Sequence, residues 1–385
     1  MIAHFRTVCV LALACLAPLA AQDSTQQKGS LRWQLKPGDK IPCTFTLLLE
    51  ESFELKGMMP PQQTQQEVSY GATHEVKSIE GDVATIEATV DSIRARMGLG
   101  MMGEMAYDSK SDDAQNPMRG IRHAVGQKFT FKLSRTGQVS EVSGGDALVQ
   151  TMRDAMGKEK PPAGQGGGDQ GGMGGMMGFD PNAVAAQVAA QLPTIVFSDA
   201  ALSGSLKLVN DVLPADESAT TWSRDVDVSL PGAGRLKFKA DHETTGAADG
   251  NVRIGAKVPG EIEFERDFGG SGAGDPMADQ VRKMMGEAKV IRKEAHGSAS
   301  FSTTKGRLLD SELVVQVDSE GDLPPFLKAM MGQQGGGEQL PDDIKMARNT
   351  AVTMRYVLEA ASTGGAATPA PTPAPQGGDK TGQKF

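Results

Sequence analysis

Apolar and polar residues alternate along most of this sequence, with the two-residue period of strands that bury one face. The clearest case is residues 128–133, in which Phe129, Phe131 and Leu133 are separated by polar residues. Arg135-Thr136-Gly137 then form a turn, and residues 138–142 run back. This stretch predicts a β-hairpin.

A short helix is predicted directly after this hairpin, over residues 146–156. Asp146 stands at the start of the helix as its N-cap, and Gly157 ends it. The apolar positions share one helical face, which indicates that the helix packs on the hairpin; they are Leu148, Met152, Ala155 and Met156.

A second hairpin is predicted from residues 222–230 and 235–242. Opposite side chains in a hairpin share a face, so the two apolar sets must meet, and this requirement sets the register. The loop would then run from Leu230 to Gly234. The predicted pairs are Asp225 with Lys239, Val226 with Phe238, and Asp227 with Lys237.

Three irregular features are also predicted. Ile93 breaks the alternation of its strand, which indicates a β-bulge near Asp91. Residues 98–118 are rich in Gly, Met and polar residues and predict a loop. Asp180-Pro181 is a typical helix start, and this helix should end at Pro193.

The fold class that follows is mainly β. We expect an antiparallel meander that forms a curved sheet or barrel-like body, with two or three short helices. The domain organisation is listed by residue numbers: 1–21 signal peptide, 30–160 N-terminal β half, 161–179 Gly/Met-rich linker, 180–361 C-terminal β half, and 362–385 disordered Pro/Thr/Ala tail.

The first 21 residues have the pattern of a secretory signal peptide. His4 and Arg6 precede an apolar segment, and Leu19-Ala20-Ala21 forms a small-residue cleavage site. The protein is therefore expected to be exported, to the periplasm or the extracellular space. Lipid anchoring at Cys15 is disfavoured, because apolar residues continue beyond this cysteine.

Charge and cysteine content restrict the function further. A net charge of -9 disfavours nucleic-acid binding, which needs a basic surface. No stretch after the signal is long and apolar enough to predict a transmembrane helix. Signal cleavage leaves Cys43 as the one cysteine, and its phase with Ile41 and Phe45 places it in the core.

Three stretches resemble a family of exported bacterial proteins that carry a domain of unknown function. They are the opening Leu31-Arg32-Trp33-Gln34-Leu35-Lys36-Pro37-Gly38-Asp39, the segment from Gly126 to Val139, and Thr220-Thr221-Trp222. The resemblance implies a β-rich exported protein, and it implies no particular activity, cofactor or catalytic residue.

Motifs for catalysis or cofactor binding are weak in this sequence. Gly98-x-Gly100-x-x-Gly103 matches a dinucleotide fingerprint, but the residues that follow do not predict the helix that this motif requires. The histidines lack metal-ligand spacing, and His74 and His242 lie on apolar strand faces, where they should be buried. We therefore predict a protein without cofactor or catalytic residues.

Methionine clusters support an alternative function. Soft thioethers suit Cu(I), and an exported protein with several of them could bind this ion. Methionine is also a flexible apolar filler, so packing explains the same clusters. The candidate ligands are Met97, Met101, Met102, Met105, Met173, Met176 and Met177.

The leading hypothesis is an exported, non-catalytic β-protein whose interior is either a plain core or a pocket for an apolar or lipid-like ligand of the cell envelope. Its expected partners are such a ligand or an envelope component. The alternatives are a Cu(I)-binding periplasmic protein and a hydrolase that lacks a recognisable motif.

Overall fold

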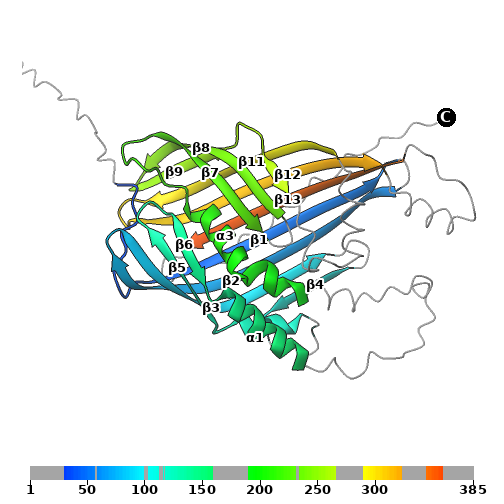
Figure 1. The fold of residues 1–385 in the computed structure, drawn as a ribbon, viewed down its shortest axis with the longest axis horizontal. Coiled ribbons are helices and arrows are strands. Elements are labelled where there is room, and N and C mark those ends of the chain that lie inside the picture. The colour runs from blue at the N-terminus through cyan, green and yellow to red at the C-terminus, as the bar shows by residue number, and fades with distance from the viewer. Residues whose placement is uncertain are drawn as a thin grey trace, which may run out of the picture.

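One antiparallel sheet of 13 strands forms the body of the protein (Figure 1). This finding confirms the mainly β class and the antiparallel meander. The computed structural model describes residues 30–56, 59–98, 103–111, 116, 118–158, 190–230, 234–265, 289–322 and 344–358. The predicted signal peptide, the 161–179 linker and the 362–385 tail lie outside these residues.

The N-terminal strands form a meander in chain order. The bulge predicted near Asp91 is confirmed, because Gly71 pairs with Ser92 while Ala72 pairs with Val90. The loop prediction for residues 98–118 was wrong in part, since residues 104–108 pair with β3 as a strand. The strands are β1 (Lys40–Leu55), β2 (Met59–Glu80), β3 (Val83–Gly98), β4 (Glu104–Asp108), β5 (Lys128–Ser134) and β6 (Val139–Ser143).

The C-terminal strands form a second meander, and the register predicted for its first hairpin is confirmed. Asp225 pairs with Lys239, and Val226 pairs with Phe238. The strands reach further than expected, because Leu230 and Gly234 also pair. The strands are β7 (Thr221–Leu230), β8 (Gly234–Ala248), β9 (Asn251–Lys257), β10 (Glu263–Glu265), β11 (Lys289–Ser302), β12 (Arg307–Asp322) and β13 (Lys345–Leu358).

The first and last strands join the two meanders. β1 pairs with β13 from Cys43 opposite Leu358 to Leu55 opposite Met346. The first and the last strand of the chain therefore lie side by side in the middle of the sheet (Figure 1). The path runs β10-β8-β9-β11-β12-β13-β1-β2-β3-β5-β6. Because β10 and β6 end this path, the sheet is open.

Helix α1 (Gly145–Lys158) lies where the sequence predicts it, with Leu148 and Met152 buried. The predicted cap was wrong. Asp146 accepts a hydrogen bond from the backbone N–H of Asp199 (3.1 Å), and Asp199 accepts one from the N–H of Gly145 (2.7 Å). Each carboxylate thus serves the start of the other helix, where N–H groups lack partners within their own helix.

Helix Ala190–Phe197 continues through Pro193, where the sequence predicts its end. Proline removes one helical hydrogen bond, while burial of Val196 and Phe197 favours the continued helix. Helix α3 (Asp199–Asn210) follows directly, and Ser198 caps it by accepting from the N–H of Ala201 (3.2 Å).

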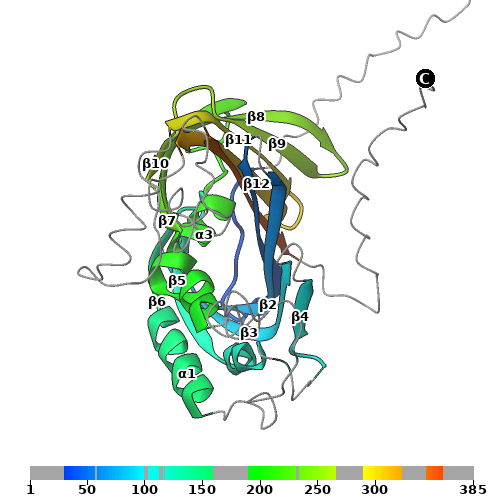
Figure 2. The ribbon, with the colours of Figure 1, turned by 90° about the vertical axis from the view of Figure 1, so that its right-hand side faces the viewer.

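Helix α3 fills the concave side of the sheet (Figure 2). It contacts β7 near one end of the strand path and β6 at the other. Leu202, Leu206 and Val209 are at most 1% exposed, as expected of a helix that is apolar around most of its circumference. The helix therefore bridges the gap that the open sheet leaves.

One finding concerns membranes. Within the described residues, no single helix is long and apolar enough to cross a bilayer. Helix Ala190–Phe197 and α3 have the required length and composition only when they are taken together, and a bend of 48° separates them.

Candidate functional site

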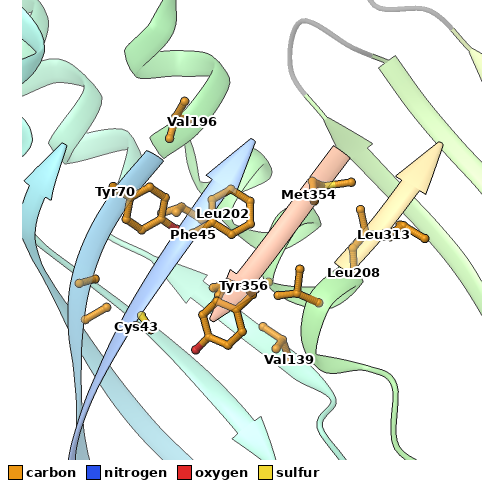
Figure 3. Close-up of a cluster of buried hydrophobic side chains, with 14 of the residues drawn as sticks. Cys43, Phe45, Tyr70, Val139, Val196, Leu202, Leu208, Leu313, Met354 and Tyr356 are labelled. Carbon is orange, nitrogen blue, oxygen red and sulfur yellow. The ribbon is translucent and has the colours of Figure 1, made fainter. Parts of the chain in front are cut away.

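A cavity of about 240 Å³ lies between the C-terminal part of α3 and strands β7, β8, β9, β11 and β12. Leu208 and Val212 line it from the helix side, and Phe238, Ile254 and Leu313 line it from the sheet. Figure 3 shows Leu208 and Leu313 on facing elements. The cavity is larger than the engineered apolar cavity of about 150 Å³ that binds benzene in another protein.

Small residues on neighbouring strands create this space. Ala256 of β9 lies between His242 of β8 and Gly297 of β11 in the cross-strand register. Gly297 in turn faces Leu313 of β12, and all four residues line the cavity. Protein interiors are normally close-packed, so two adjacent positions without a large side chain leave a volume that Leu or Val would occupy.

Two arginines hold the segment that directly follows the cavity-lining residues Asp211 and Val212. Arg32 is 6% exposed and donates to the carbonyl oxygens of Pro214 (2.9 Å) and Ala215 (2.6 Å). Arg224 of β7 donates to the carbonyl oxygen of Leu213 (2.7 Å). Charge-assisted hydrogen bonds of this kind are stronger than neutral ones, so this segment is well anchored.

His242 supplies a polar group to the cavity. It is 6% exposed, and its ring lies parallel to that of Trp222 within 5°, with centroids 5.6 Å apart. Burial lowers the pKa of His242 to about 4, more than the hydrogen bond with the Ala240 backbone raises it. The imidazole is therefore uncharged at neutral pH. Its Nδ1 makes no hydrogen bond with any described residue.

Asp211 and Arg224 form the second polar feature of the cavity. Asp211 Oδ1 lies 3.5 Å from Arg224 Nε, and both side chains are largely buried. Burial raises the pKa of Asp211, although the Arg224 and Lys207 cations act in the opposite direction. The pair is a carboxyl group and a guanidinium cation held beside the cavity.

A different buried polar cluster surrounds His74. Its Nε2 lies 3.3 Å from Cys43 Sγ, and its Nδ1 lies 3.2 Å from Tyr356 Oη. Cys43 and Tyr356 lie on neighbouring strands of the core (Figure 3). Burial lowers the pKa of His74 to about 4 and raises that of Tyr356. The core positions predicted for Cys43, His74 and His242 are thus confirmed.

The predicted metal ligands are only partly described. Met97 and Met105 face each other on β3 and β4, with Met97 1% exposed in the core. The other candidates, Met101, Met102, Met173, Met176 and Met177, lie outside the described residues. No group of three or more His, Cys, Asp or Glu side chains suited to a metal occurs in the described part of the chain.

Two other sequence features, Gly98 of the glycine motif and the carboxylate of Asp227, form part of the sheet and its surface. β3 ends at Gly98 and the antiparallel strand β4 begins at Glu104, so the glycine motif is followed by a strand and not by the helix that a dinucleotide site requires. Asp227 lies opposite Lys237 as predicted, but it binds Arg235 with both oxygens (2.8 Å each). The bidentate guanidinium fits the carboxylate better than an ammonium does.

The sequence interpretation missed α3, and with it one wall of the cavity. A signal was present, because Leu202, Leu206 and Val209 follow Ser198 at the spacing of one helical face. The cavity itself has no such signal. It depends on which strands place Ala256 and Gly297 side by side.

A family of unknown function (DUF6263) matches residues 81–166 of this chain. The match includes the segment from Gly126 to Val139 and confirms the resemblance to an uncharacterised family, while the opening Leu31–Asp39 and Trp222 lie outside it. Among curated proteins, no sequence matches this chain.

Solved structures show only distant likeness. Lipovitellin, described with its lipid–protein interactions, has 8% identity and a TM-score of 0.41, over 88% of this chain and 27% of that chain. An outer membrane channel from Pseudomonas putida F1 has 6% identity and a TM-score of 0.16, over 85% and 97%. Pseudomonas aeruginosa OccK2 has 7% identity and a TM-score of 0.18, over 84% and 99%. This chain therefore spans about a quarter of lipovitellin's length.

Proposed function

We propose that this protein is a non-catalytic binding protein that holds an apolar ligand between α3 and the C-terminal strands. The observation that carries the proposal is the cavity of about 240 Å³ over Ala256 and Gly297. Burial of an apolar ligand there is favourable by roughly 25 cal/mol for each Å² removed from water.

The position of the cavity supports binding rather than a packing defect. Leu208, Val212 and Leu313 give it an aliphatic part, and the segment after Val212 is anchored by Arg32 and Arg224. Anchoring of the segment next to Val212 fixes this side of the cavity before a ligand binds, which lowers the cost of ordering on binding. The aliphatic part of the lining offers burial to an apolar ligand, and this supports a binding role.

Export to the cell envelope is part of the proposal. It rests on the N-terminal sequence alone, in which an apolar segment precedes Leu19-Ala20-Ala21. N-terminal sequencing of the protein isolated from an envelope fraction tests it. We expect the mature chain to begin at Gln22, and a chain that retains Met1 would contradict export by this route.

A cavity-filling variant tests the binding site. Ala256→Leu should place a larger side chain over Gly297 and lower the affinity for the neutral fluorescent probe N-phenyl-1-naphthylamine by at least about tenfold. Ala351→Leu is the matched control, because Ala351 lies on the opposite face of the sheet from the buried Val352. Saturable binding that is lost in the first variant and kept in the second supports the proposal. Equal binding by both variants, or no uptake by the wild type, would contradict it.

A further inference from the structure

Buried polar atoms without hydrogen bonds are concentrated at one end of this cavity. Trp222 Nε1 and His242 Nδ1 have no hydrogen-bond partner among the described residues, while Asp211 Oδ1 and Arg224 Nε make only an ion pair with each other at 3.5 Å. An unpaired buried polar atom costs about 1–3 kcal/mol, and native proteins rarely keep several of them together. A group that belongs to a ligand would explain why these atoms are retained.

The four side chains belong to one corner of the fold. Trp222 lies directly opposite His242 on β7 and β8, and Arg224 is two residues further along β7. Arg224 Nε lies 3.5 Å from Asp211, which follows α3. Asp211 and His242 both line the cavity, so an occupant lies beside these two side chains.

We propose that the ligand is an uncharged amphiphile whose hydroxyl head group binds at His242 and Asp211, with its apolar chain in the cavity. This inference rests on the proposed function and specifies the class of ligand. A hydroxyl can both donate and accept, so it matches the Asp211 carboxylate as an acceptor and His242 Nδ1 in either tautomer. Long-chain alcohols are the simplest members of this class.

The charges of the site favour a neutral head group. His242 carries no charge at neutral pH because burial lowers its pKa to about 4. The Arg224 cation is already neutralised by Asp211 at 3.5 Å. The lining contains the cation Lys207 but also the acidic residues Asp211, Asp225, Asp227 and Glu312. A carboxylate head would add an anion to this acidic lining and would lose its hydration, which is costly.

Isothermal titration calorimetry with 1-decanol and decanoate at neutral pH tests this inference on the full mature chain. We expect 1-decanol to bind at least about tenfold more tightly than decanoate. His242→Phe keeps an aromatic ring beside Trp222 and removes Nδ1, so it should weaken 1-decanol binding by about tenfold. The preference for 1-decanol over decanoate should fall with it. His296→Phe, at an exposed position on β11, is the control and should change neither affinity.

The outcomes separate this inference from the proposed function. Equal or tighter binding of decanoate, or unchanged 1-decanol binding by His242→Phe, would overturn the hydroxyl assignment. If Ala256→Leu still lowers the affinity for N-phenyl-1-naphthylamine in that case, the apolar binding site is supported and only the assignment of the head group is wrong. If the wild type binds neither the probe nor 1-decanol, both proposals fail.

Discussion

Trp222 and His242 lie directly opposite each other on β7 and β8, and their rings are parallel within 5° at a centroid distance of 5.6 Å. His242 is 6% exposed, whereas Trp222 is half-buried. His242 lines the cavity, and Trp222 lies beside it on β7. It also provides a natural reporter, since the sequence contains only one other tryptophan, Trp33.

Fluorescence of Trp222 should follow the charge of His242. In a Trp33→Phe variant, we expect emission to fall as His242 is protonated, since a stacked imidazolium quenches indole fluorescence. Burial lowers the pKa of His242, so the midpoint should lie near pH 4, well below the ordinary histidine value of about 6.5. Circular dichroism at each pH checks that the chain is folded. Adding His242→Phe should abolish the transition, and a midpoint near 6.5 would contradict the buried, uncharged imidazole.

The cluster of Cys43, His74 and Tyr356 should make stability depend on pH. The unfolded chain protonates His74 below about pH 6.5, but the folded protein does so only near pH 4. The contribution of His74 is therefore complete above 6.5 and is lost as the pH falls toward 4, at about 1.4 kcal/mol per pH unit. Urea unfolding across this range measures it. His74→Gln keeps polar ends near Cys43 and Tyr356 but cannot take up the proton, so its slope should be smaller by this amount; parallel curves would refute the prediction.

Arg32 should contribute more to the free energy of unfolding than a single exposed charge does. Its guanidinium donates to the carbonyl oxygens of Leu31, Pro214 and Ala215, and it lies 3.3 Å from Glu217. Arg32→Ala leaves these carbonyl groups without their partner and should lower the free energy of unfolding by about 3 kcal/mol. Chemical denaturation measures the change.

The control for Arg32 is an exposed arginine. Arg94 pairs with Asp108 at 2.7 Å, and its side chain is 57% exposed. Surface ion pairs contribute little, so Arg94→Ala should cost less than about 1 kcal/mol. Similar losses in both variants would show that the contacts of Arg32 with the loop after α3 are not important for stability.

Gly137 should be intolerant of any side chain, because the turn between β5 and β6 packs against the end of α3. Its φ is +86°, and an added Cβ would lie 2.2 Å from the carbonyl oxygen of Asn210. Gly81 also has a positive φ (+59°) but has open space around it. We expect Gly81→Ala to cost about 1 kcal/mol for the left-handed backbone alone. Gly137→Ala should cost about 3 kcal/mol, because backbone overlap is added. Thermal unfolding compares them, and equal losses would mean that this contact is soft.

The sequence by itself determined the strands and much of their pairing. Alternation predicts the hairpin of β7 and β8, and the requirement that apolar faces meet predicts its register, including Val226 opposite Phe238. Loss of alternation at Ile93 predicts the bulge at Asp91. Burial of Cys43 and His74 follows from their phase on a strand. These features depend on neighbours within one or two strands, and such short-range patterns are visible in a sequence.

Only the tertiary structure decided where the strands meet over long distances and what they enclose. Pairing of β1 with β13 and the exchange of caps between Asp146 and Asp199 join residues far apart in the chain. The cavity exists because Ala256 and Gly297 become neighbours beneath α3. The unpaired Nδ1 of His242 at its end depends on the same packing. Burial and desolvation arise when separate segments exclude water together, and no local pattern of residues carries that information.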